Sequence, residues 1–262
     1  MAVKVDIEGV SKHYGDEDEE HFVHALDDVS FRLEDGEFVS LLGPSGCGKS
    51  TLLHIVAGFE IATRGAVRVN GHPVGGPGAD RGMVFQDYAL FPWMTVIENV
   101  TFGLRIKNMP QPQCEAIARE FIALVGLAGF EHRYPHQLSG GMRQRSALAR
   151  SVANNPDVLL MDEPLAAIDA LTRNALQEEI LKVCDARDGR PRKSVLYVTH
   201  SIEEAVFLSD RIVVMTPRPG RILEVVAVPF DRPRNDDTRL SPAFQQLAGE
   251  IWSTLKSHVK PN

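Results

Sequence analysis

The segment that most restricts what this chain can fold into is a glycine-rich turn set between an apolar run and a helical pattern. Gly43–Thr51 reads GPSGCGKST and fits G-x-x-x-x-G-K-[ST], the pattern of phosphate-binding loops. The apolar run Phe38–Leu42 leads into it, and the helical pattern Thr51–Ala57 leads out of it and stops at Gly58. The motif is therefore in the strand–loop–helix setting that phosphate binding needs, which disfavours an accidental glycine-rich turn.

Each part of this loop has a predicted task in binding a nucleotide. Glycines allow a tight turn that aims backbone N–H groups at phosphate oxygens, and the helix start adds the positive end of its dipole. We expect Lys49 to reach the β- and γ-phosphates of ATP and Ser50 to ligate Mg²⁺. The residues predicted to contact the nucleotide here are Gly43, Pro44, Ser45, Gly46, Cys47, Gly48, Lys49, Ser50 and Thr51.

Composition and charge exclude several classes of function. The net charge of −7 gives no general basic surface, so we expect no nucleic-acid partner. The first residues lack the apolar core of a signal peptide, and no apolar run approaches the ~20 residues of a membrane-spanning helix. Cys47, Cys114 and Cys184 are widely spaced and are expected to be free thiols in a reducing compartment. We interpret Cys47 as a small residue at a permissive position rather than as a redox switch.

The rest of the chain alternates between strand and helix patterns. Strand patterns occur at Val3–Ile7, Val29–Leu33, Ala66–Val69, Asp157–Asp162, Ser194–Thr199 and Arg211–Met215. Helical patterns occur at Cys114–Val125, Arg143–Asn154, Leu171–Arg187 and Ala243–His258, the first with an apolar face of Ile117, Phe121, Leu124 and Val125. The acidic run 16–20 is expected to be a solvated loop.

This alternation predicts an α/β fold of the P-loop NTPase (RecA-like) class, with a mainly parallel sheet and helices on both faces. We expect an antiparallel β sub-domain in the N-terminal third and an inserted helical sub-domain at about residues 90–155. The main domain is predicted to span residues 1–228, followed by a short C-terminal extension, 229–262, that ends in a helix.

Two further strand patterns end in residues suited to ATP hydrolysis. Asp162 and Glu163 close one buried run, and His200 follows the next, at the edge where open α/β sheets bind ligands. We expect Asp162 to hold Mg²⁺ through water, Glu163 to act as general base on the attacking water, and His200 to contact the γ-phosphate. An acid pair or a histidine at a strand end is usually structural or solvent-exposed, and the phosphate loop is what favours the catalytic interpretation.

A second anion-binding helix start occurs at Ser139. Ser139 is a good N-cap, and Gly140 and Gly141 leave backbone N–H groups open. Because no strand precedes this turn, it cannot easily serve the same phosphate from within one chain. It suggests two chains that each lend this turn to the other's nucleotide, although such a pentapeptide alone is typical of an ordinary helix cap.

Six motifs, which follow one another along the chain in the family's order, resemble those of the ATP-binding subunits of ABC transporters. The resemblance covers nearly the whole chain. Gly43–Thr51 is similar to the Walker A loop, Val158–Glu163 to Walker B with its catalytic glutamate, and Leu138–Met142 to the signature. The other three motifs are single-residue matches, Gln86 for the Q-loop, Asp169 for the D-loop and His200 for the switch histidine. In addition to the six, Tyr14 lies where the family stacks an aromatic side chain on adenine. The resemblance implies that Gln86 takes part in hydrolysis and Mg²⁺ binding, and that Asp169 lies at the nucleotide interface.

The resemblance also implies partners. The working unit would be a homodimer in the ATP-bound state, with each ATP between the Walker loops of one subunit and the Ser139 turn of the other. Closure and opening of this dimer would drive transmembrane permease subunits, served indirectly by a solute-binding protein. The expected location is peripheral, at the cytoplasmic face of the inner membrane.

Finer features resemble the nitrate/sulfonate/taurine importer ATPases, namely residues 82–93, 134–137, 142–145 and 215–221. The alternatives are an ABC ATPase of an export or lipid-trafficking system, or a soluble ABC ATPase of iron–sulfur assembly or DNA repair. We hypothesise that part of Leu90–Trp93 lines a groove for a short helix of the membrane subunit. Pro164–Asp169 departs from the family's D-loop run at Leu165, Ala166 and Ile168, which leaves the strength of communication across the dimer open.

Overall fold

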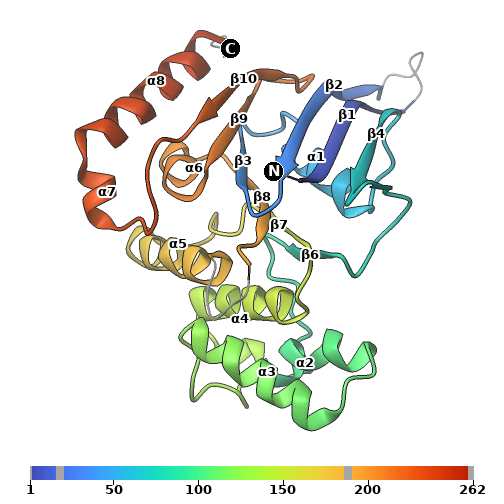
Figure 1. Ribbon diagram of the computed structural model, residues 1–262, viewed down its shortest axis with the longest axis vertical. Helices are drawn as coiled ribbons and strands as arrows, with labels where there is room; N and C mark the ends of the chain where they lie inside the picture. The colour runs from blue at the N-terminus through green and yellow to red at the C-terminus, as the bar shows by residue number, and fades with distance from the viewer. Residues whose placement is uncertain (1, 16–20, 186–190, 259–262) are drawn as a thin grey trace. The chain divides into compact units, whose positions relative to one another are not determined.

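The computed structural model describes residues 2–15, 21–185 and 191–258, which divide into two compact units (Figure 1). Unit 1 consists of Met1–Gly78 and Arg192–Asn262, and unit 2 of Ala79–Pro191. The acidic run 16–20 and the last two residues of the helix predicted at Leu171–Arg187 lie outside the described residues.

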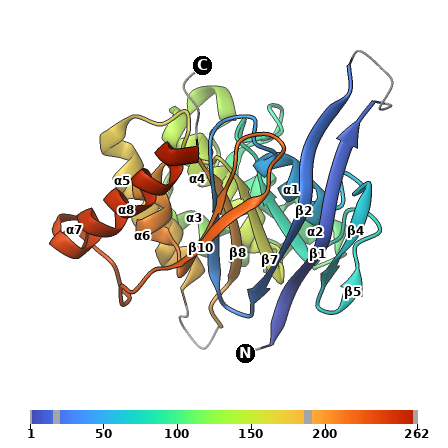
Figure 2. The same cartoon turned by 90° about the horizontal axis from the view of Figure 1, so that it is seen from above.

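Unit 1 contains an antiparallel sheet in the order β2-β1-β4-β5. Its strands are β1 (Val3–Tyr14), β2 (Val23–Glu34), β4 (Arg64–Val69) and β5 (His72–Pro73), and they lie side by side in Figure 2. Asn70 and Gly71 join β4 to β5 with φ of 50° and 77°, the left-handed pair that a tight hairpin turn requires. The antiparallel N-terminal strands predicted from the sequence are therefore present.

The second group of strands in unit 1 has the order β10-β9-β3-β8. These strands are β3 (Phe38–Leu42), β8 (Ser194–Thr199), β9 (Arg211–Met215) and β10 (Ile222–Ala227). Strands β9, β3 and β8 run parallel, and β10 is antiparallel to β9. Every residue of β3 and β8 is buried, which explains why both are continuous apolar runs rather than alternating patterns.

The helices of unit 1 are α1 (Lys49–Ala57), α6 (Ile202–Leu208), α7 (Asp236–Leu240) and α8 (Pro242–His258). The C-terminal extension packs on α6, with Phe244 and Ile251 of α8 each 2% exposed. The buried guanidinium of Arg234 donates hydrogen bonds to the carbonyls of Val206, Phe207 and Ser209 at the end of α6, at 3.2, 2.9 and 2.7 Å. The extension is thus bound to the helix that follows β8.

Unit 2 contains the parallel strands β6 (Arg81–Val84) and β7 (Val158–Asp162) and the helical block. The helices are α2 (Val96–Ile106), α3 (Gln111–Leu124), α4 (Gly140–Ala153) and α5 (Ala170–Cys184), with a 3₁₀ turn η1 at Pro135–Gln137. Helices α2, α3 and α4 pack on one another. Asn99 of α2 is fully buried and binds the N–H and the carbonyl of Phe91, so the chain entering α2 is fixed.

The buried face of α3 differs from the predicted one. Its buried residues are Cys114, Ala118, Phe121 and Ile122, whereas Ile117 and Leu124 are half-buried. Phe121 and Val125 are buried as predicted, so the prediction was right for two of its four residues. It was wrong for the other two because it followed the largest apolar side chains. The small residues Cys114 and Ala118 mark the side where α3 comes close to its neighbours.

Candidate functional site

The phosphate-binding loop has the conformation that its glycines predict. It joins β3 to α1, and Gly46 and Gly48 have φ of 74° and 96°. A Cβ at Gly48 would lie 2.7 Å from the carbonyl oxygen of Ala25, so space as well as conformation requires glycine there. Helix α1 starts at Lys49 with no side-chain cap and no acidic residue in its first turn. The helix start is therefore suited to an anion.

Lys49 is 4% exposed and its ammonium lies over the loop. It donates hydrogen bonds to the carbonyls of Gly43 and Pro44 at 2.8 and 2.9 Å. The thiol of Cys47 is also buried, 3.8 Å from the Lys49 ammonium, and burial raises the pKa of Cys47 despite that cation. Cys47 is thus mostly a protonated thiol, in agreement with its interpretation as a packing residue.

The turn between β9 and β10 packs against the phosphate-binding loop. Gly220 exchanges backbone hydrogen bonds with Ala25 and Asp27 of β2, and a Cβ at Gly220 would lie only 2.0 Å from the carbonyl oxygen of Cys47. Arg218 of the same turn donates from Nε to the carbonyl of Gly46 at 3.1 Å. The sequence singled out this turn only as a subgroup feature, and nothing in the pattern indicated that it supports the phosphate-binding loop.

Tyr14 ends β1 and is 37% exposed. The ammonium of Lys12 lies 4.8 Å from the centre of its ring, and Lys12 also pairs with Glu60 at 3.0 Å. A cation over one part of the ring fixes its orientation. The exposed part of the Tyr14 ring can stack on a purine.

His200 follows β8 at the same edge from which the phosphate-binding loop leaves β3. Leu42 and Thr199, the last residues of the two strands, are register partners in the parallel pair. The buried carboxylate of Glu204 accepts hydrogen bonds from the hydroxyls of Thr199 and Tyr197, at 2.8 and 3.0 Å. The residue before His200 is therefore held rigidly, while the His200 side chain is exposed.

Gln86, Asp162 and Glu163 lie at one edge of the strand pair in unit 2. Val84 and Met161 are register partners in β6 and β7, so the residues that follow leave from the same end. Asp162 is 8% exposed, and Glu163 adopts the left-handed region with φ 41°. A non-glycine residue held in this region is strained, and such strain concentrates at functional sites.

The signature turn and the D-loop aspartate both begin helices. The hydroxyl of Ser139 accepts a hydrogen bond from the N–H of Met142 at 3.3 Å, which confirms Ser139 as the N-cap of α4. Asp169 caps α5 by accepting from the N–H of Thr172 at 3.0 Å. A Cβ at Gly140 would lie 3.4 Å from the hydroxyl of Tyr88, so the residues after Gln86 come close to the signature turn.

The predicted site residues therefore form two groups, one in each unit. Unit 1 carries Tyr14, Gly43, Pro44, Ser45, Gly46, Cys47, Gly48, Lys49, Ser50, Thr51 and His200, and unit 2 carries Gln86, Ser139, Gly140, Gly141, Asp162, Glu163 and Asp169. None of the helices formed by the described residues combines the length and hydropathy of a bilayer crossing.

Comparison with known proteins identifies the family. The profile described as ABC transporter matches residues 26–166, more than half of the chain. The chain belongs to the ABC transporter family. As an ATP-binding subunit of that family, it binds and hydrolyses ATP.

Several relatives of this ABC transporter subunit are similar over most of their length. An uncharacterised ABC transporter ATP-binding protein of Methanocaldococcus jannaschii is 50% identical over 99% of this chain and 94% of that protein. The taurine import ATP-binding protein TauB of Pelagibacter ubique is 52% identical over 89% of this chain and 88% of that protein. A solved ATP-binding cassette, in a dimeric post-hydrolysis state bound to ADP and Pi, superposes with a TM-score of 0.73, is 32% identical, and is covered completely by 87% of this chain.

Proposed function

We propose that this protein is the ATP-hydrolysing subunit of an ABC importer for a small solute, a sulfonate such as taurine being the leading candidate and nitrate another. The observation that carries the proposal is the set of taurine import ATP-binding proteins from four bacteria, which are 48–52% identical over 88–89% of this chain. The subunit would work at the cytoplasmic face of the membrane with transmembrane permease subunits, and a solute-binding protein would deliver the solute to them.

The two groups of site residues are proposed to act on one nucleotide in a homodimer. Lys49 and the glycine-rich turn would bind the phosphates, with the Tyr14 ring against adenine. Glu163 would take a proton from the attacking water, and His200 would contact the γ-phosphate. The Ser139 turn of the second copy would complete the site, since α4 presents an open helix start of the kind that binds anions.

The residues proposed for Mg²⁺ suit that ion. Ser50, Gln86 and Asp162 offer a hydroxyl, an amide oxygen and a carboxylate, and Mg²⁺ prefers oxygen ligands. Asp162 is nearly buried at the carboxyl end of β7, where a charged carboxylate is stabilised by a cation. When bound, the ion would neutralise charge on the phosphates during transfer.

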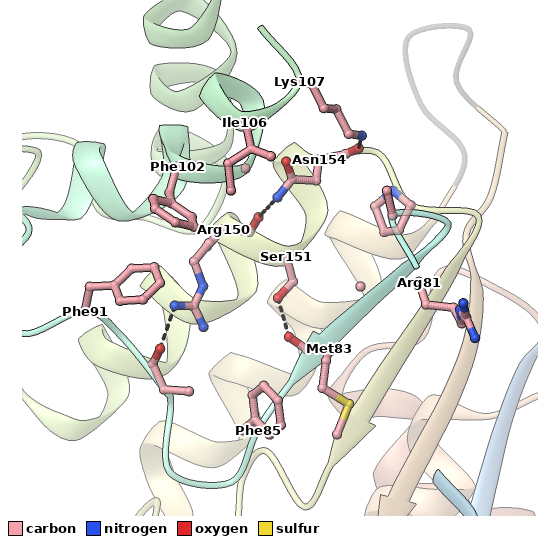
Figure 3. A pocket seen from close by; sticks show the side chains of 15 residues that line it. Arg81, Met83, Phe85, Phe91, Phe102, Ile106, Lys107, Arg150, Ser151 and Asn154 are labelled. Carbon is pink, nitrogen blue, oxygen red and sulfur yellow. Dashed lines mark hydrogen bonds between the residues drawn. The ribbon is translucent and has the colours of Figure 1, made fainter. Parts of the chain in front are cut away.

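A pocket in unit 2 is the proposed docking site of the permease. It has a volume of about 430 Å³ and is lined mainly by apolar side chains from β6, from the residues on either side of Gln86 and from α2, among them Phe91, Phe102 and Ile106 (Figure 3). Its charged lining residues are Arg81, Lys107 and Arg150, and none of its lining residues is acidic. A short amphipathic segment that carries a carboxylate would complement it.

The hypothesis for Leu90–Trp93 is refined by this pocket. Only Phe91 of these four residues lines it, while Trp93 is 70% exposed and packs on Phe91 with ring centres 5.7 Å apart. We therefore expect Trp93 to form part of the rim. A large exposed aromatic side chain at such a rim is typical of a contact surface.

The experiment is reconstitution with the cognate permease in proteoliposomes, with solute uptake and ATP hydrolysis measured together. Solute-dependent stimulation of ATP hydrolysis and inward movement of taurine are expected, and ATP-dependent efflux would contradict import. Trp93→Ala should lower the permease-dependent stimulation ~10-fold while the subunit alone hydrolyses ATP at the wild-type rate. Trp252→Ala, which removes the other exposed tryptophan, on α8, is the matched control and should leave both rates unchanged. Equal loss of both rates in Trp93→Ala would contradict the docking site.

A further inference from the structure

The chain immediately after Gln86 is strained. Tyr88 and Ala89 are consecutive non-glycine residues in the left-handed region, with φ of 61° and 47°. Such residues persist only where the surroundings hold them. The N–H of Ala89 donates to the carbonyl of Asp87 at 2.6 Å, which closes a tight turn. Local sequence offers no glycine to relieve this conformation, so a tertiary contact must maintain it.

That contact is Arg150, near the end of α4. Its guanidinium donates to the carbonyl of Ala89 at 2.6 Å (Figure 3) and also to the carbonyl of Tyr88 at 3.1 Å. It also lies 5.7 Å from the centre of the Phe91 ring. Burial lowers the pKa of Arg150, yet an arginine stays charged at neutral pH. A half-buried cation with two carbonyl acceptors forms strong, directional hydrogen bonds that fix both peptide groups at once.

Helix α4 holds the same segment at both of its ends. At its start, the Tyr88 hydroxyl comes close to Gly140, and the guanidinium of Arg143 lies 5.4 Å from the Tyr88 ring. At its end, Arg150 binds the Tyr88 and Ala89 carbonyls, and Ser151 donates to the carbonyl of Met83 in β6 at 2.7 Å. The helix that begins at the signature turn is therefore rigidly connected to the strand and the turn on either side of Gln86.

We propose that Arg150 is a positioning residue for ATP hydrolysis, which holds the strained Tyr88–Ala89 turn so that Gln86 is placed for the reaction. Arg150 does not touch the nucleotide in this role and acts through the backbone of the turn. Because Arg150 and the signature turn belong to one helix, a displacement of the signature turn moves the Gln86 segment with it. The geometry thus links the Ser139 turn, which would bind the nucleotide of the second copy, with Gln86, which would serve the nucleotide bound to its own copy.

Arg150 and the turn that it holds also form one wall of the proposed docking pocket. Ala89, Phe91 and Arg150 all line it. A permease segment bound in the pocket would therefore contact Arg150 and this turn directly. This consequence rests on the proposed function. The role of Arg150 in hydrolysis rests on the proposed role of Gln86 but not on the docking site, and it can be tested with the subunit alone.

The test measures kcat and KM for ATP in the full-length subunit carrying Arg150→Gln, Arg150→Lys, Ala89→Gly, or Arg150→Gln with Ala89→Gly. Loss of the two hydrogen bonds should lower kcat ~10- to 100-fold, as expected when a reacting group is misplaced by about 1 Å. KM for ATP should change less than ~3-fold, because only an interaction that matters in the transition state is lost. Arg150→Lys, whose ammonium reaches one carbonyl at a time, should fall between Arg150→Gln and the wild type.

Ala89→Gly separates positioning from stability. Glycine adopts the left-handed conformation without strain, so this variant should melt at the wild-type temperature or higher, and its kcat is the reference value for the double variant. In the double variant, Ala89→Gly should restore the thermal stability that Arg150→Gln removes, without restoring kcat. Recovery of kcat in the double variant, or a wild-type kcat in Arg150→Gln, would overturn the proposal, because Arg150 would then only offset strain.

A second measurement adds the permease. Stimulation of hydrolysis by the permease should be lost in the double variant, while the permease still co-purifies with it. If Ile106→Glu, which places a charge in the pocket, leaves co-purification intact, the docking site is wrong and the role of Arg150 stands on the measurements of the subunit alone. If stimulation persists in the double variant but not in Trp93→Ala, the docking site stands and the link through Arg150 is refuted.

Discussion

Gly220→Ala tests whether the β9–β10 turn supports nucleotide binding. The added Cβ would lie 2.0 Å from the carbonyl oxygen of Cys47 and 3.0 Å from the Met215 side chain. The first neighbour is backbone of the phosphate-binding loop and cannot rotate away. Gly220 is also held on its other side by backbone hydrogen bonds to Ala25 and Asp27, so the phosphate-binding loop must yield.

The expected loss of affinity for MgATP follows from the overlap between the added Cβ and the carbonyl oxygen of Cys47. Relief of the contact requires the loop to move by ~1 Å, and forcing an extra methyl group into packed structure costs ~1–3 kcal/mol. If that free energy opposes the loop conformation that binds phosphate, the affinity for MgATP falls by ~5- to 150-fold. We expect the fold to survive, because the clash is confined to one side of the loop.

Isothermal titration calorimetry with MgATP, on the Glu163→Gln background so that ATP persists, measures this loss. Gly75→Ala is the matched control, since a Cβ at Gly75 would meet nothing within 4 Å. A Gly220→Ala protein that binds MgATP as tightly as the control would refute the reasoning, because the turn would then not limit the loop.

Three further outcomes are expected. Glu163→Gln should lower kcat ~10²- to 10⁴-fold, as for loss of a general base. MgATP binding should persist in calorimetry, and nucleotide-dependent dimers should persist in size-exclusion chromatography. Wild-type turnover in this variant would show that the general base lies elsewhere. Lys49→Ala should weaken MgATP binding more than ~10-fold by calorimetry, since it removes the buried cation at the loop, and wild-type affinity would contradict that role. For Asp210, burial by itself raises the pKa, but Arg232 and the N–H of Phe38 lower it overall, so its stabilisation is complete above the unfolded-state pKa of ~3.9 and is lost as pH falls through the folded-state value. Asp210→Asn should therefore lower Tm at pH 7 and weaken the pH dependence of stability below pH ~4 in scanning calorimetry, and an unchanged Tm at pH 7 would argue against it.

The sequence predicted the parts of this protein that depend on local rules. Glycine spacing identified the loop after β3, and continuous apolar runs identified β3, β7, β8 and β9, because buried parallel strands leave no polar face. The N-cap at Ser139 follows from the preference of such residues for helix starts. Short elements such as α6, α7 and β10 were not predicted, since five to seven residues carry too little periodicity.

The support of the site could not be predicted, because it depends on contacts between residues far apart in the chain. Arg218 meets Gly46 across 172 positions, and Arg150 meets Ala89 across 61. The left-handed conformations of Tyr88, Ala89 and Glu163 have no local signal either, since none of these residues favours that region. The sequence therefore predicts which residues act on the nucleotide, and the structure shows which contacts support those residues.

The contact between the C-terminal extension and α6 affects how this chain can be shortened or varied. A chain trimmed after Val228 would retain every nucleotide motif and still lose Arg234, whose guanidinium covers three carbonyls at the end of the helix that follows His200. We therefore expect trimming at that point to destabilise α6 and to lower the rate of ATP hydrolysis. Substitutions within the extension are then expected to change the rate of hydrolysis while every nucleotide motif stays the same.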